Sequence, residues 1–169
     1  MPYYDASVPK TLAVVRVATA LFFLLFGAYK VFGTSFAHGG FQQLLQGWVQ
    51  NGAVSLYQPF LADLVLPHAV FFGYLIGLVE LLVGICLLLG LWVRAVSVVG
   101  ALHMLSLTLA TWWEPGHGMP LWQYFAAELD HLPLLFLFVL FFVADAGREW
   151  GVDGYLQAQR ETHSSRAGF

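Results

Sequence analysis

Four long apolar stretches constrain this chain more than any other feature of its sequence. They run over residues 11–32, 67–92, 95–113 and 121–146. A helix needs about 20 apolar residues to cross the hydrocarbon core of a bilayer. We therefore expect an all-α membrane protein, with a four-helix transmembrane bundle formed by residues 1–156 and a polar, frayed C-terminal tail at 157–169.

The composition excludes several classes of protein. Hydrophobic residues make up 59% of the 169 residues and charged residues 10%, whereas soluble domains carry about 25% charge. A soluble domain of this size could not bury so much apolar surface, so an ordinary soluble enzyme is excluded. The net charge of −3 gives no basic surface for nucleic acid. The single cysteine, Cys86, excludes an internal disulfide and a thiolate metal cluster.

The positive charges predict how the spans are oriented. Six of the seven lysine and arginine residues fall on one side of the spans, namely Lys10, Arg16, Arg94, Arg148, Arg160 and Arg166. The connections 33–66 and 114–120 contain no lysine or arginine, and Lys30 lies near their side. Since positive residues favour the cytoplasmic side, we expect a multi-pass protein of the inner (cytoplasmic) membrane with both termini in the cytoplasm.

The first outer connection carries an amphipathic pattern. Its apolar residues recur at helical spacing, at Phe41, Leu44, Leu45, Trp48 and Val49, and its glutamines occupy the other face. This pattern predicts an uncharged helix on the outer leaflet between the first two spans. Such a helix either packs on the bundle as a lid or gates a lateral entrance for a lipid-soluble ligand.

Ionisable residues within the spans predict a polar cluster. In the second span Glu80 shares one helical face with Gly73, Gly77 and Gly84. Because glycines let a neighbouring helix approach closely, we expect Glu80 to face the bundle interior. Counting about 1.5 Å per residue from the cytoplasmic side gives depths of about 12 Å for His103, 18 Å for Glu80, 21 Å for His131 and 29 Å for Lys30.

Two interpretations of this cluster remain open. In one, Glu80 forms an ion pair with His131 or Lys30 that fixes the register of the helices. In the other, Glu80, His103 and His131 are catalytic residues that bind and protonate a quinone head group, while Lys30 and Asp130 adjust the charge of the site.

A metal site is a third reading of the cluster. Glu128 and His131 have the Glu-x-x-His spacing of di-iron bundles. Such a site needs a second copy of the motif and further carboxylates. The chain has one copy, so we predict no metal.

Three motifs resemble the pattern of a known family. The first span reads Arg16 followed by Gly27-x-x-Lys30, and the second reads Gly77-x-x-Glu80-x-x-x-Gly84 before Leu89-Gly90 and Arg94. The end of the fourth span reads Gly147-Arg148-x-x-x-x-Asp153. In this order the motifs resemble the DoxX/DoxD family of small four-span membrane proteins, over roughly residues 12–156.

The resemblance implies a role in redox chemistry. DoxD-type members are the small membrane subunit of a thiosulfate:quinone oxidoreductase, and other members associate with redox and thiol-stress complexes. Lys30, Glu80 and Arg94 match the family pattern, whereas His103, Glu128, Asp130 and His131 come from depth and polarity alone.

We therefore expect a membrane subunit of a redox complex. It would bind quinone, contact lipid and a partner subunit, and be linked to thiosulfate or thiol oxidation; a homo-oligomer is also open. The alternatives are a non-catalytic scaffold or anchor subunit and a small transporter.

Overall fold

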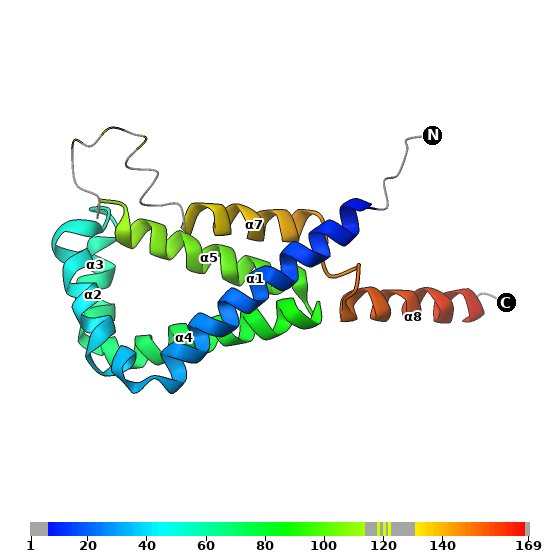
Figure 1. Ribbon diagram of the computed structural model, residues 1–169, viewed down its shortest axis with the longest axis horizontal. Helices are drawn as coiled ribbons and strands as arrows, with labels where there is room; N and C mark the ends of the chain where they lie inside the picture. The colour runs from blue at the N-terminus through cyan, green and yellow to red at the C-terminus, as the bar shows by residue number, and fades with distance from the viewer. Residues whose placement is uncertain (1–6, 114–117, 119, 121, 123–130, 168–169) are drawn as a thin grey trace.

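Helices and turns account for the described chain, residues 7–113, 118, 120, 122 and 131–167 of the computed structural model, and no strand occurs in those ranges (Figure 1). In chain order the elements are α1 (Ser7–Phe32), η1 (Phe36–Gly40), α2 (Phe41–Gly47), η2 (Trp48–Gly52), α3 (Gln58–Phe60), η3 (Leu61–Val65), η4 (Leu66–His68), α4 (Ala69–Leu89), α5 (Val93–Thr111), α7 (His131–Val143) and α8 (Val152–Ala167). The predicted all-α class is confirmed.

Three helical segments are long and apolar enough to cross a membrane, at Ser7–Phe32, Gln58–Leu89 and Val93–Thr111. The turn between the last two is tight, as expected, but it lies at residues 90–92, slightly earlier in the chain than the expected span ends place it. Gly90 takes a left-handed conformation with φ 63°, and the amide of Leu91 donates to the carbonyl of Cys86 at 2.9 Å, which closes α4. Of the predicted fourth span at 121–146, α7 is the described helix, and residues 121 and 123–130 lie outside the described residues.

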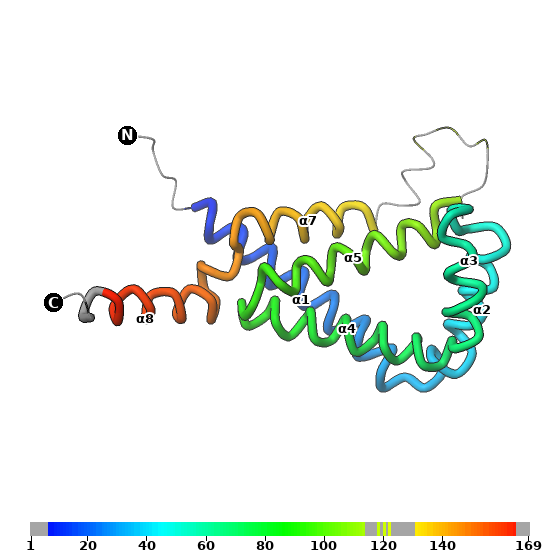
Figure 2. The backbone as a smooth tube through the Cα atoms, turned by 180° about the vertical axis from the view of Figure 1, so that it is seen from behind, coloured from blue at the N-terminus to red at the C-terminus, as the bar shows by residue number. Residues whose placement is uncertain are grey.

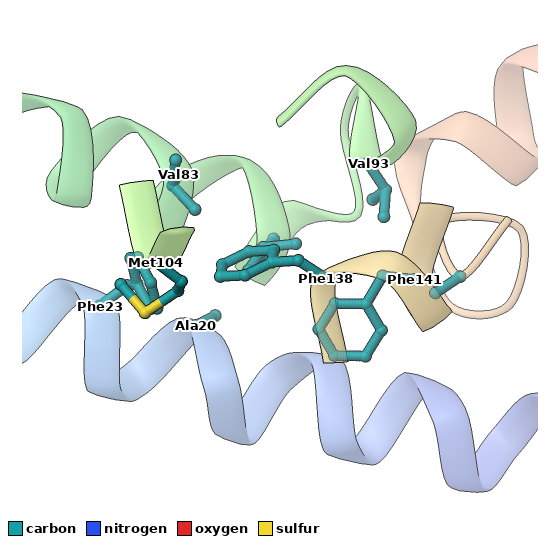
Figure 3. Close-up of a cluster of buried hydrophobic side chains, with 9 residues drawn as sticks. Ala20, Phe23, Val83, Val93, Met104, Phe138 and Phe141 are labelled. Atoms are coloured by element: carbon teal, nitrogen blue, oxygen red, sulfur yellow. The ribbon is translucent and has the colours of Figure 1, made fainter. Parts of the chain in front are cut away.

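The spans pack in two pairs, α1 along α4 and α5 along α7, and the tight turn joins α4 to α5 as an antiparallel hairpin (Figures 1 and 2). The start of α1, the α4–α5 turn and α8 lie at one end of the bundle, and α2 and α3 lie at the other. The core between the pairs is apolar. It is centred on Phe23 of α1 and Phe138 of α7, whose rings meet edge to face with centroids 5.1 Å apart (Figure 3).

Residues 36–68 form a helical cap over one end of the bundle. Phe41 and Leu45 of α2 are buried against Leu61 and Ala110, whereas the glutamines of α2 are exposed. The amphipathic segment therefore packs on the bundle, as one of the two expected arrangements requires. Residues Gln58–His68 that follow are also helical, and the helical turns before residue 67 were not predicted.

A buried arginine holds the opposite end together. The Arg16 guanidinium, which has no solvent exposure, donates to the backbone carbonyls of Ala146, Glu149 and Trp150. The Asp153 carboxylate accepts from the amides of Trp92 and Val93, at 2.8 and 2.9 Å, and so caps α5. Two of the motifs that carry the family resemblance thus meet in one hydrogen-bonded end of the bundle.

The C-terminal residues differ from expectation. We expected a frayed tail from residue 157, but α8 continues as a helix through Ala167. It projects beyond the bundle in Figure 1. Its first turn is anchored by Asp153, whose carboxylate caps α5 and whose amide donates to the carbonyl of Gly90 at 2.9 Å. A helix that is anchored at its first turn needs no further nucleation, which is the costly step for an isolated segment.

The approach of α1 to α4 requires glycine. A Cβ at Gly84 would lie 2.9 Å from the backbone nitrogen of Leu24, and one at Gly27 would lie 2.7 Å from that of Leu81. Backbone atoms cannot move aside as a flexible side chain can. The glycine face predicted for α4 therefore sets the distance between the two helices.

Replacement of Gly84 by alanine tests this contact. We expect Gly84→Ala to destabilise the protein by about 1–3 kcal/mol, because the added methyl group forces α1 and α4 apart. Thermal unfolding in detergent measures the effect. The matched control is Gly47→Ala in α2, where an added Cβ would meet nothing within 4 Å. Equal melting temperatures for the two variants would contradict the proposed contact.

Candidate functional site

Three ionisable side chains from three helices meet inside the bundle. Lys30 of α1 donates from Nζ to Oε1 of Glu80 in α4 at 2.5 Å, and Nε2 of His103 in α5 lies 3.0 Å from the same oxygen. The three side chains are 16%, 5% and 10% exposed, in the order Lys30, Glu80, His103. Glu80 therefore faces the interior, and both of its partners are bases.

The height of His103 differs from the sequence estimate. We expected His103 to lie about 6 Å nearer the cytoplasmic side than Glu80, from the assumed ends of the spans. The observed α4 ends at Leu89 and α5 begins at Val93. Glu80 is nine residues before the first of these ends and His103 ten after the second. An antiparallel hairpin brings residues at equal distances from its turn to the same level.

The second oxygen of Glu80 has a different environment. Oε2 is buried and has no hydrogen-bond partner within the described part of the chain. A buried acceptor without a partner is costly, since its desolvation is not compensated. Such an atom indicates a place where a donor from a ligand or a water molecule would bind.

A pocket of about 530 Å³ has Glu80 in its lining. Its lining residues are Phe22, Phe23, Phe26, Lys30, Glu80, Met104, Leu107, His131, Pro133 and Leu134. The lining is thus mostly apolar with a few polar groups, which is typical of sites for small organic ligands. Phe22 and Phe26 are half exposed on the outer face of α1, so the pocket reaches the surface that contacts lipid.

His131 lies in the wall of this pocket rather than in the Lys30–Glu80–His103 cluster. Its Nδ1 is 3.5 Å from Oγ1 of Thr111, at the end of α5. The sequence analysis placed His131 and Glu80 at similar depths, and both residues line the pocket. Asp130 and Glu128, which we also singled out, lie outside the described residues.

A second, smaller cavity lies beneath the cap. Its volume is about 150 Å³, and His103, Ser106 and Tyr57 are its polar lining residues. The hydroxyls of Tyr57 and Ser106 are 2.6 Å apart. Ser106 follows His103 by three residues, so helical spacing places the two on one face of α5. Tyr57 reaches this place through the tertiary fold of the cap, which no local pattern in the sequence predicts.

Arg94, the third residue that matches the family motif, is not part of this site. It lies in the first turn of α5, nine residues before His103. Its guanidinium stacks over the ring of Phe142 at 4.8 Å, and it lines a cavity near the start of α1 with Arg148. Arg148 is itself paired with Asp145 at 2.6 Å. Within the described ranges no group of three or more metal-ligating side chains occurs.

Removal of Lys30 tests the ion pair. We expect Lys30→Met to destabilise the protein by about 3–5 kcal/mol, because it leaves a buried carboxylate without its cation. The double variant Lys30→Met/Glu80→Gln should recover most of that loss, since no charge is then left unpaired. Thermal unfolding of both variants measures this.

The control for this cycle is Arg148→Gln, which breaks the exposed pair with Asp145 and should cost less than about 1 kcal/mol. If Lys30→Met costs no more than Arg148→Gln, the pair is not a significant interaction.

Comparison with known proteins gives one finding. A family model described as DoxX matches residues 11–113, which is more than half of the chain. The match covers α1, the cap, α4 and α5, and so includes Lys30, Glu80 and His103. No curated protein and no solved structure matches the chain significantly.

Proposed function

Since the chain belongs to the DoxX family of membrane proteins, we propose that it is the membrane subunit of a redox complex and binds a quinone head group in the pocket beside Glu80. The observation that carries the proposal is Glu80, which lines an apolar pocket and whose Oε2 is a buried acceptor without a partner in the described chain. A ligand with a polar head and an apolar body fits such a site.

The route into the pocket supports a lipid-soluble ligand. Phe22 and Phe26 line the pocket from α1 and are exposed on the face that would contact acyl chains. A quinone dissolved in the bilayer could reach this opening without passing through water. The cap packs over the end of the bundle, so this lateral opening does not depend on its movement.

The polar groups suit the chemistry of a quinone, which takes up two protons together with two electrons. Lys30 would donate a hydrogen bond to an oxygen of the head group. His103 is in hydrogen-bond contact with Glu80 and would exchange protons with it. His131 offers a second polar group in the same pocket.

The electrons would come from a partner subunit, for which oxidation of thiosulfate or a thiol is the proposed chemistry. We place the protein in the inner membrane with α8 in the cytoplasm, as the distribution of positive charge favours. The Glu80 pocket would then lie in the outer half of the membrane, near an extracytoplasmic donor.

A pocket-filling variant tests whether quinone binds here. We expect Leu134→Trp to weaken the binding of a decyl-chain ubiquinone analogue at least about tenfold, because the indole would occupy the pocket. Titration of the protein in lipid nanodiscs measures the affinity. Val139→Trp is the matched control, since Val139 lies on the same helix and is exposed. Equal affinities for the two variants would contradict the proposed site.

A second candidate function is a non-catalytic scaffold. It is favoured by the Lys30–Glu80–His103 contacts, which join three helices and would fix their register without any ligand.

The two functions differ in what Glu80→Gln does within the isolated native complex. A scaffold predicts reduced assembly and unchanged turnover per assembled complex. The quinone site predicts that quinone reduction per assembled complex falls by about 100-fold or more, because glutamine cannot transfer a proton.

A further inference from the structure

We infer that the Glu80 pocket binds the reduced, hydroxyl-bearing form of its ligand, a hydroquinone, more tightly than the quinone. This inference rests on the proposed function and specifies which oxidation state the same site prefers. It follows from the hydrogen bonds that Glu80 already makes and from the one that it lacks.

The first oxygen of Glu80 is already occupied. Oε1 accepts from Nζ of Lys30 at 2.5 Å and lies 3.0 Å from Nε2 of His103. The pairing with Lys30 makes Glu80 a carboxylate, which accepts hydrogen bonds and donates none. A ligand therefore gains little by approaching Oε1.

The second oxygen discriminates between the two forms of the ligand. Oε2 is buried without a partner in the described residues, and Glu80 lines the pocket. A hydroquinone hydroxyl can donate to it and form a charge-assisted hydrogen bond. A quinone carbonyl is itself an acceptor, so it would leave Oε2 unpaired and face it with another negative dipole.

Lys30 does not remove this difference. Its ammonium group has three protons, of which one is directed to Glu80, and Lys30 also lines the pocket. A remaining proton can be donated to a carbonyl oxygen or to a hydroxyl oxygen. A hydroquinone can therefore satisfy both Lys30 and Oε2, whereas a quinone can satisfy Lys30 alone.

The preference has a consequence for the redox couple. A quinone, two electrons and two protons give one hydroquinone, and tighter binding of the hydroquinone makes the bound quinone easier to reduce. For a two-electron couple, a tenfold difference in affinity raises the midpoint potential by about 30 mV. The pocket would thus favour the acceptance of electrons from the partner subunit.

Binding of three related probes to the wild-type protein in nanodiscs tests the inference. The probes are a decyl-chain ubiquinone, its hydroquinone, and the dimethyl ether of that hydroquinone, which has the same ring and no donor. We expect the hydroquinone to bind about tenfold more tightly than the other two. Equal affinities, or an ether that binds as tightly as the hydroquinone, would overturn the inference.

Two variants locate the effect at Oε2. In Glu80→Gln the amide oxygen can accept from Lys30 and the amide NH₂ can face the pocket, so the preference for the hydroquinone should be lost or reversed. Val139→Leu changes an exposed residue of α7 that is not part of the pocket lining and should keep the wild-type ratio. A Glu80→Gln variant that keeps the wild-type ratio would overturn the assignment to this oxygen, and the ether comparison needs no variant.

Failure of the inference and failure of the proposed function give different results. If all three probes bind equally and Leu134→Trp weakens each of them, the pocket binds the head group but does not select its oxidation state. If Leu134→Trp leaves the binding of every probe unchanged, the proposed function itself is wrong.

Discussion

A carboxylate at membrane depth must have a partner, and the arrangement of this bundle depends on how Glu80 obtains one. In hydrocarbon no water can compensate an unpaired charge. Lys30 and His103 approach the same oxygen of Glu80 from two other helices. These contacts fix the heights of α1, α4 and α5 relative to one another. They leave the second oxygen of Glu80 without a partner in the described residues, and Glu80 lines a pocket.

Packing between the helices has to be specific because lipid tails are as apolar as the side chains of the bundle. The hydrophobic effect therefore gives little drive for association within the membrane. Here glycine lets α1 and α4 approach closely, and Arg16 joins α1 to the segment after α7 through the backbone carbonyls of Glu149 and Trp150. The polar contacts lie at two levels, one near each end of α1, with the apolar core of Phe23 and Phe138 between them.

The sequence predicted those features that depend on local spacing. The glycines around Glu80 indicated an inward-facing carboxylate. The helical spacing of apolar residues such as Phe41 and Leu45 indicated the amphipathic cap helix. The predicted depth of His103 was wrong because the estimate was counted from assumed helix ends, and the turn lies at residues 90–92. The helical conformation of residues 58–66 was not predicted, although Pro59 and Pro67 are compatible with it. Both occupy the first turn of a helical segment, where proline is tolerated.

The contact between Tyr57 and Ser106 could not be predicted, since it joins the cap to α5 through the tertiary fold. The contact of Asp153 with the start of α5 also depends on the tertiary fold. Its spacing from Arg148 was recognisable as a motif, but the two amides that it caps lie about 60 residues earlier in the chain.

The α4–α5 hairpin limits how the chain could vary in length. Glu80 and His103 are both positioned by their distance from the Gly90 turn. Insertion of one residue into either helix between the turn and its polar residue would rotate that side chain by about 100° and displace it by about 1.5 Å. The pair would be separated, and one charge would face the acyl chains. Deletions and duplications between residues 80 and 103 should therefore be tolerated poorly.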